Sequence, residues 1–268
     1  MTITAFYEGI GLCKQAKAAA LALDEVYNEE TCAPAFALFD DAKTWEKALS
    51  DLRELCGEDA DGMKMFVCLS HCAAQRAQRY RRLGIPEEIY WATMRFLSRF
   101  LHADSEKAGH LVFRWAWWFP RQLALKEFRI GAMEYEMLTA EGERRISVHI
   151  PADADFSDEA VGASLADARA FMKKFFPAFA EAPMYCESWL LSPALRELLP
   201  EGSNILRFQR RFDILRVDEN SPAALEWIFP DPKVKPEDFP EDTRLRRAAK
   251  RYLLSGGRIG WTLGKLRE

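Results

Sequence analysis

Hydrophobic residues in the first half of the chain recur every three or four positions, which is the spacing of helices that bury one side. Between residues 43 and 56 this stripe consists of Trp45, Ala48, Leu49, Leu52 and Leu55. A second helix is predicted to begin near Asp61 or Gly62 and to end at Gly84, and a third opens at Pro86. The pattern therefore predicts a helical N-terminal domain over residues 1–125.

Beyond residue 125 the spacing shortens toward two, as in β-strands. Residues 128–138 and 144–150 predict a hairpin, and further strands are predicted over 184–190 and 204–212. Between them, a helix is expected to open at Ser157, which is a good N-cap, and to end before Pro177. Another helix is expected over residues 243–255, and a last short strand over 258–264. We therefore predict an α+β protein whose C-terminal domain spans residues 126–268.

Composition narrows the class of protein. The chain has 268 residues, and 49% of them are hydrophobic, which is enough for a globular core. Its net charge of −4 disfavours nucleic acid as a partner. The N-terminus lacks the pattern of a signal peptide, and no apolar run approaches the ~20 residues of a membrane span. Six cysteines in a chain of this length do not indicate a disulfide framework. We therefore expect a cytoplasmic protein with reduced thiols and no membrane contact.

Several strings of residues in the second half carry a family resemblance. They are Phe128–Gly131 with Glu134–Glu136, Val148–Pro151, Cys186–Leu191, Ser203–Phe212 and Ala248–Gly260. In these strings the chain resembles the GNAT-like acyltransferase family, which pairs a helical N-terminal domain with a C-terminal domain of the GNAT-type N-acetyltransferase fold. The resemblance implies a GNAT-like mixed sheet in the C-terminal domain. The sequence differs from the family at Glu187, a position where family members commonly have a histidine.

The resemblance also implies a substrate, acetyl-CoA or another acyl-CoA, and an acceptor that is a small molecule or a peptide with an amine or hydroxyl group. The pyrophosphate of CoA would lie at the N-terminus of the helix after the fourth strand, where free N–H groups attract anions. The corresponding residues here are Pro151, Ala152, Ser157 and Asp158. The stretch from Ala152 to Asp158 contains three carboxylates and no Lys or Arg, which opposes phosphate binding.

Candidate catalytic groups lie on the predicted strands. His149 is the best general base, because the pKa of an unperturbed imidazole lies near neutrality. Glu134 and Glu136 are further candidate bases, and Tyr185 is a candidate acid for the departing CoA thiolate. Cys186 is a candidate nucleophile, although a buried structural thiol is the favoured interpretation beside Glu187.

Strand alternation predicts a polar sheet face that would bind substrate. If residues 204–212 form a strand, Arg207 and Gln209 share one of its faces. They would then line a common polar surface with His149 and one side of the middle strand, where Ser188 is the candidate substrate-binding residue. The alternative interpretation is a sheet face that is simply solvated.

No metal site is predicted. Cys68, His71 and Cys72 share one helix face, but zinc needs a fourth ligand and no Cys-x-x-Cys knuckle is present. The sequence leaves two functions open: an acyl-CoA-dependent acyltransferase, and a non-catalytic relative that binds a ligand or protein. It does not indicate an oligomeric state.

Overall fold

The computed structural model describes residues 1–140, 142–229, 231 and 233–267. Its contacts divide the chain into two compact units, Met1–Ile130 and Gly131–Glu268. The division falls a few residues beyond the boundary at residue 125 that the change of periodicity predicts. Each unit is described by itself.

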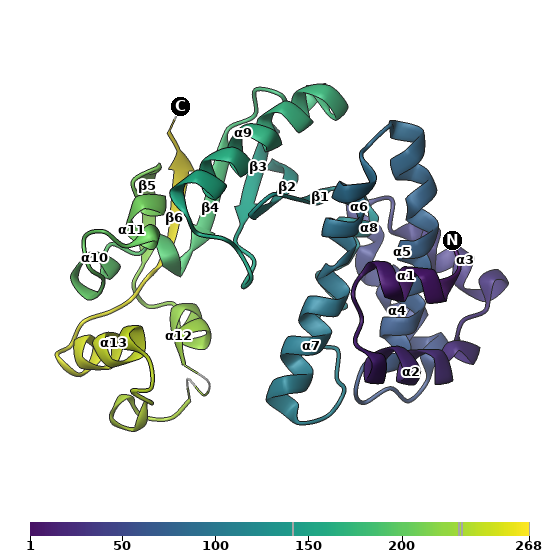
Figure 1. Cartoon of the computed structure of the whole chain (residues 1–268), viewed down its shortest axis with the longest axis horizontal. Coiled ribbons are helices and arrows are strands. Elements are labelled where there is room, and N and C mark those ends of the chain that lie inside the picture. The colour runs from purple at the N-terminus through teal and green to yellow at the C-terminus, as the bar shows by residue number, and fades with distance from the viewer. Residues whose placement is uncertain (141, 230, 232, 268) are drawn as a thin grey trace. The chain divides into compact units, whose positions relative to one another are not determined.

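The first unit is built almost entirely from helices. Its helices are α1 (Ile3–Gly9), α2 (Lys14–Ala22), α3 (Glu29–Leu38), α4 (Trp45–Cys56), α5 (Met63–Leu83), α6 (Glu87–Met94), α7 (Phe96–Ala108) and α8 (Pro120–Leu123). Helix α5 is the central element, and most of its length is buried (Figure 1). The Asp59 carboxylate accepts hydrogen bonds from the backbone N–H groups of Lys64 and Met65, which fixes the start of α5.

The predicted helices of this unit form close to their expected bounds. Helix α5 begins one residue after Gly62 and is closed by Gly84 in the left-handed conformation. Helix α4 buries Ala48, Leu49 and Leu52 as its stripe predicts. Leu55 was expected on the same stripe but is 42% exposed, because it lies at the margin of the buried face near the helix end.

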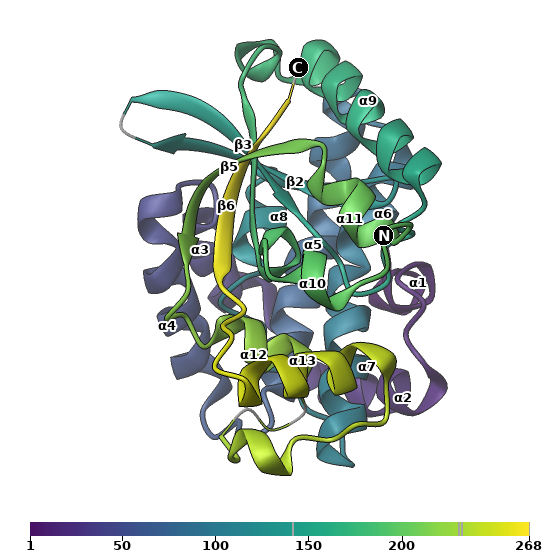
Figure 2. The same cartoon turned by 90° about the vertical axis from the view of Figure 1, so that its left-hand side faces the viewer.

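The second unit contains most of a mixed six-stranded sheet. Its order is β1-β2-β3-β4-β6-β5, formed by β1 (Glu127–Ile130), β2 (Met133–Ala140), β3 (Glu143–His149), β4 (Met184–Ser188), β6 (Trp261–Leu266) and β5 (Phe212–Asp218). Strands β2 and β3 are antiparallel, β3 and β4 are parallel, and β6 lies between β4 and β5 as an antiparallel neighbour of both. The far ends of β2 and β3 extend past the rest of the sheet (Figure 2).

Helix α9 (Asp158–Phe175) lies across one face of this sheet (Figure 1). It opens at Ser157, whose hydroxyl accepts a hydrogen bond from the Ala160 N–H at 3.2 Å, as predicted for an N-cap. The hydroxyl groups of Tyr135 on β2 and Ser164 on α9 are hydrogen-bonded at 2.8 Å. This contact fixes α9 against the sheet and places its N-terminus just after the end of β3.

Short helices follow β4. They are α10 (Leu195–Leu198), α11 (Asn204–Gln209), α12 (Ala223–Ile228) and the basic helix α13 (Arg244–Leu254). They surround a second apolar cluster that includes Leu195, Leu206, Phe229 and Ile259. No helix among the residues described here is long and apolar enough to cross a lipid bilayer.

Three strand predictions are wrong in detail. Residues 204–209 form helix α11, capped by the Ser203 hydroxyl, and the strand begins only at Phe212. Residues 128–138 form two strands, because Gly131 turns the chain with a φ of 60°. Strand β4 ends at Ser188, and Trp189–Leu191 form a 3₁₀ turn.

Candidate active site

One face of the sheet gathers polar side chains from three adjacent strands. Glu134 pairs with His149 across β2 and β3, and Glu136 pairs with Ser147. Ser147 in turn pairs with Tyr185 on β4. Directly paired residues point to the same side of a sheet, so all five side chains share one face. The opposite face carries the alternating residues, such as Tyr135, which contact α9.

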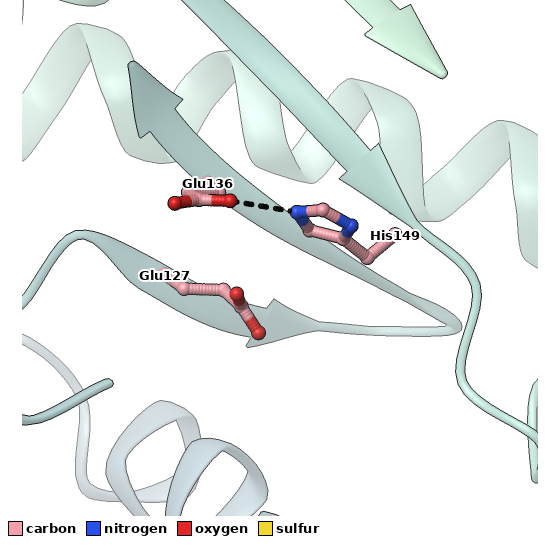
Figure 3. A group of neighbouring side chains, drawn as sticks. All are labelled: Glu127, Glu136 and His149. Carbon is pink, nitrogen blue, oxygen red and sulfur yellow. Dashed lines mark hydrogen bonds and ion pairs between the residues drawn. The ribbon is translucent and has the colours of Figure 1, made fainter. Parts of the chain in front are cut away.

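His149 and Glu136 form the central contact of this face. His149 Nε2 lies 2.9 Å from Glu136 Oε2, and the two side chains are 25% and 7% exposed (Figure 3). His149 ends β3, so its ring is anchored by the strand at one side and by a carboxylate at the other. A ring whose Nε2 donates to a carboxylate has Nδ1 as its basic nitrogen. The pair therefore has the chemistry of an oriented general base.

A further buried carboxylate, that of Glu127, belongs to the helical unit. Glu127, on β1, accepts hydrogen bonds from Trp118 Nε1 at 3.1 Å and Gln122 Nε2 at 2.7 Å. These donors are neutral side chains of the same unit, so Glu127 has structural partners there.

The parallel pairing of β3 and β4 ends at Ser147, shortly before His149. Their parallel pairing covers two positions in the described chain, Ile146 with Met184 and Ser147 with Tyr185. Beyond this point β4 continues to pair with β6 as far as Ser188. The end of β4 is therefore paired with β6, and the end of β3 is paired with β2. Diverging parallel strands present backbone groups to which an extended ligand can hydrogen-bond.

The N-terminus of α9 has a cation that its own sequence lacks. Arg211 Nη2 lies 2.6 Å from Asp158 Oδ1 and donates to the Asp158 carbonyl oxygen at 3.0 Å. The same guanidinium lies 3.4 Å from the position that a Cβ on Gly162 would take. Arg211 thus lies along the first turn of α9. The sequence did not connect Arg211 with α9, because residues 204–212 were interpreted as a strand on which Arg211 shares a face with Arg207 and Gln209.

The loop before α9 is organised by its own side chains. Asp155 Oδ1 accepts a hydrogen bond from the Ser157 N–H at 2.8 Å, and this bond lowers the pKa of Asp155. Pro151 is buried, and its carbonyl accepts from the Ala154 N–H at 3.0 Å, while Ala152 is exposed. Two of the three carboxylates expected to oppose phosphate, those of Asp155 and Asp158, are thus engaged with local donors.

Several candidate residues lie away from the polar face. Cys186 is buried on the α9 side of β4, and burial, with a smaller contribution from the charge of Glu187, raises the pKa of its thiol. Ser188 shares that side, and its hydroxyl accepts from the Leu190 N–H at 3.1 Å. These contacts support the interpretation of Cys186 as a structural thiol.

The two residues assigned to a third polar strand lie on α11 instead. The Gln209 amide is buried and donates to the carbonyl oxygens of Leu190 and Ser192 at 3.0 and 2.9 Å. Arg207 is exposed on the same helix, with Nη1 3.5 Å from Asn204 Oδ1. The expectation that Arg207 and Gln209 continue the polar sheet face through strand pairing is therefore wrong.

The cysteines and histidine on α5 have other partners. His71 Nε2 lies 2.7 Å from Asp24 Oδ1, and its ring stacks on Tyr27 with centroids 3.6 Å apart. Burial raises the pKa of Cys72 to about 12. His71 therefore has structural partners within the helical unit, and Cys72 is a buried thiol.

The geometry thus defines a GNAT-type sheet with a histidine–carboxylate pair beside diverging parallel strands. Comparison with known families agrees: residues 1–125 match the N-acyltransferase N-terminal domain and residues 92–266 match the GNAT-like C-terminal domain. The chain therefore belongs to the family that combines these two domains.

Solved structures of acyltransferases have a similar fold. The chain is similar to an acyltransferase mutant in complex with octanoyl-CoA, with a TM-score of 0.73 and 19% identity over 100% of this chain and 99% of that one. It is also similar to an acyltransferase in complex with decanoyl-CoA (TM-score 0.72, 21% identity) and to one in complex with decanoyl-CoA and teicoplanin (0.71, 20%), each over 99% of both chains. A search of curated proteins finds no match.

Proposed function

We propose that this protein is an acyl-CoA-dependent acyltransferase that moves an acyl group from a CoA thioester to an amine or hydroxyl acceptor. The observation that carries the proposal is the His149–Glu136 pair, with its 2.9 Å contact, at the point where β3 and β4 stop pairing. Family membership and the fold shared with acyl-CoA complexes of other acyltransferases support it.

In this proposal the CoA donor extends between the ends of β3 and β4. Its pantetheine amides would hydrogen-bond to backbone groups there, and its pyrophosphate would reach the first turn of α9, near Pro151, Ala152 and Ser157. Arg211 would supply the positive charge, because its contact with Asp158 places a guanidinium at this turn. The acyl groups of the similar structures make a medium-length chain the first donor to test.

The proposed chemistry is direct transfer in a ternary complex. As the acceptor nitrogen or oxygen attacks the thioester carbonyl, its proton passes to His149, whose resulting charge is stabilised by Glu136. The C–S bond then breaks and CoA leaves as a thiolate. Tyr185, on the same sheet face, would return a proton to that sulfur. Glu134, paired with His149 in the strand register, is the second candidate base.

The acceptor is proposed to be a small molecule. A similar acyltransferase has been solved in complex with the glycopeptide teicoplanin. Glycopeptides and smaller amines therefore form the first panel of acceptors to test. A cytoplasmic location fits the free cysteines.

A non-catalytic binding role was favoured by the acidic loop before α9. Arg211 weakens that argument, because a cation lies where the loop sequence offers none. The catalytic proposal is therefore the one we carry forward.

The test is an assay of CoA release. The purified protein is incubated with acetyl-, octanoyl- and decanoyl-CoA and the acceptor panel, and free CoA thiol and acylated products are measured by absorbance and mass spectrometry. The proposal predicts acceptor-dependent release that is lost in His149→Ala and kept in His71→Ala, a matched histidine variant in the other unit. If a bound acyl-CoA yields no product with any acceptor, the binding role replaces the catalytic one.

A further inference from the structure

Two buried thiols in the helical unit lie next to each other. Cys56 ends α4, and Cys68 lies on α5; their sulfur atoms are 3.9 Å apart, and the residues are 4% and 0% exposed. Neither has a part in the acyl transfer proposed above. At this distance the two sulfurs are neighbours in a non-bonded contact, and a disulfide would bring them to about 2.05 Å.

Cys56 borders a cavity in the helical unit. Cys56 lines a pocket of about 340 Å³ within the helical unit, together with Gly57, Asp59, Ala60, Met65 and Phe113. Cys68, buried on α5, does not line this pocket. A small reagent that enters the pocket therefore meets Cys56 first.

The surroundings of Cys56 favour its thiolate. The hydrogen bond with Cys68 lowers the pKa of Cys56, and this effect exceeds the opposing effects of burial and of Asp59. The ammonium group of Lys64, which donates to the Cys56 carbonyl oxygen at 3.0 Å, acts in the same direction. Cys68 has a raised pKa, first because of the same hydrogen bond, and so keeps its proton. The thiolate is the nucleophilic form of cysteine.

We propose that Cys56 is a peroxide-reactive site and that Cys68 is its resolving thiol, so that oxidation joins α4 to α5 by a disulfide. In the first step the Cys56 sulfur attacks a peroxide oxygen; an S–O bond forms, the O–O bond breaks and hydroxide leaves. In the second step the Cys68 sulfur attacks Cys56; the S–S bond forms, the S–O bond breaks and the proton of Cys68 leaves with the hydroxide as water. Two thiols lose two electrons, and hydrogen peroxide becomes two waters.

The local backbone can accommodate this bond. Cys56 is the last residue of α4, and the chain leaves the helix at Gly57, which has a φ of 62°. The bond therefore requires a movement at this helix end. It would bring the two sulfurs from 3.9 Å to bonding distance.

The experiment maps oxidation of the full-length, reduced protein. The chain is treated with increasing hydrogen peroxide, remaining thiols are alkylated, and peptides are identified by mass spectrometry without reduction. The expected result is a peptide pair linked through Cys56 and Cys68 that appears at lower peroxide than any oxidation of Cys32 or Cys72, which are buried thiols outside the pocket. The link should disappear with dithiothreitol.

Two variants separate the roles of the thiols. In Cys68→Ser the link is lost, and Cys56 accumulates as a sulfenic acid that dimedone traps. In Ala60→Phe, which narrows the pocket, the link should form more slowly at the same peroxide concentration. The proposal is overturned if Cys56 in the folded wild-type protein is oxidised no faster than Cys32 and Cys72, or if Cys68 pairs with Cys32 instead.

Discussion

A close histidine–carboxylate pair occurs in each unit, apart from the exposed His110–Asp61 pair of the helical unit, and the surroundings of the two close pairs differ. In the helical unit His71 contacts Asp24 at 2.7 Å, and its ring is stacked on Tyr27. In the sheet unit His149 contacts Glu136 at 2.9 Å at the end of β3, beside strands that diverge. The distances are nearly equal, so the contact alone does not identify a catalytic base. The difference lies in whether a reacting group can be placed against the ring.

The carboxylates differ as well. The Asp24 side chain is 39% exposed, whereas that of Glu136 is 7% exposed. An exposed carboxylate is screened by water and contributes little to the properties of its partner. A buried carboxylate fixes ring orientation and stabilises the imidazolium more strongly. We therefore propose a catalytic role for His149 and a packing role for His71, which the following experiments test.

The largest expected effect comes from His149→Ala. Removal of a general base typically lowers turnover by about 10²- to 10⁴-fold. Affinity for the acyl-CoA should stay nearly unchanged, because the ring is proposed to act on the acceptor. Steady-state kinetics with the acceptor found in the panel, together with calorimetry for the donor, measures both. Equal turnover in His149→Ala and wild type would remove the distinction between the two pairs.

Arg211→Ala should act on the donor and leave the base intact. Loss of a charge-assisted contact costs about 1.5–3 kcal/mol, which corresponds to roughly a 10- to 100-fold rise in Kd for CoA. Turnover at saturating donor should change little. Arg207→Ala, an exposed arginine on the preceding helix α11, is the matched control and should bind CoA as wild type does. A similar loss of CoA affinity in both variants would indicate that any arginine charge on this part of the surface contributes, and would contradict a specific role for Arg211.

His71→Ala should reduce stability without reducing turnover per folded molecule. The variant loses a stacked ring and a partly exposed ion pair, for which we expect a cost of about 1–2 kcal/mol in the free energy of unfolding. Denaturant titration and the kinetic assay at a temperature well below the transition separate the two effects. A loss of turnover comparable with that of His149→Ala would contradict the packing role.

Cys186→Ala should have the smallest effect on chemistry. The thiol is buried on the α9 side of β4, and burial raises its pKa, so it is protonated at neutral pH. We expect unchanged turnover and a loss of stability of about 1 kcal/mol from the small cavity. An inactive but folded variant would reopen covalent catalysis through Cys186.

Local signals in the sequence predicted much of the fold. The bounds of α5 followed from Gly62 and Gly84, and the start of α9 followed from the Ser157 cap. These features depend on neighbours in the chain, which is why pattern and capping rules reach them. His149 could be predicted as a candidate for the same reason, because it ends a strand with clear alternation of polar and apolar residues.

The rest of the site depends on contacts between distant segments. Leu206 and Phe208 alternate as in a strand, but the Ser203 cap and packing of this short segment produced a helix. Because the segment is a helix, the Gln209 amide is buried and bonds to backbone carbonyl groups. Arg211 contacts Asp158 at the start of α9, a residue 53 positions earlier in the chain. The partnership of His149 with Glu136 requires the strand register, which alternation alone does not fix.

The central claim is that the diverging ends of β3 and β4, with the first turn of α9, bind a CoA thioester. Isothermal titration of the wild-type protein with acetyl-CoA and octanoyl-CoA tests it most directly. The account predicts saturable binding with one site per chain, weakened in Arg211→Ala and retained in His149→Ala. The absence of binding to either thioester at millimolar concentration by the folded wild-type protein would contradict it.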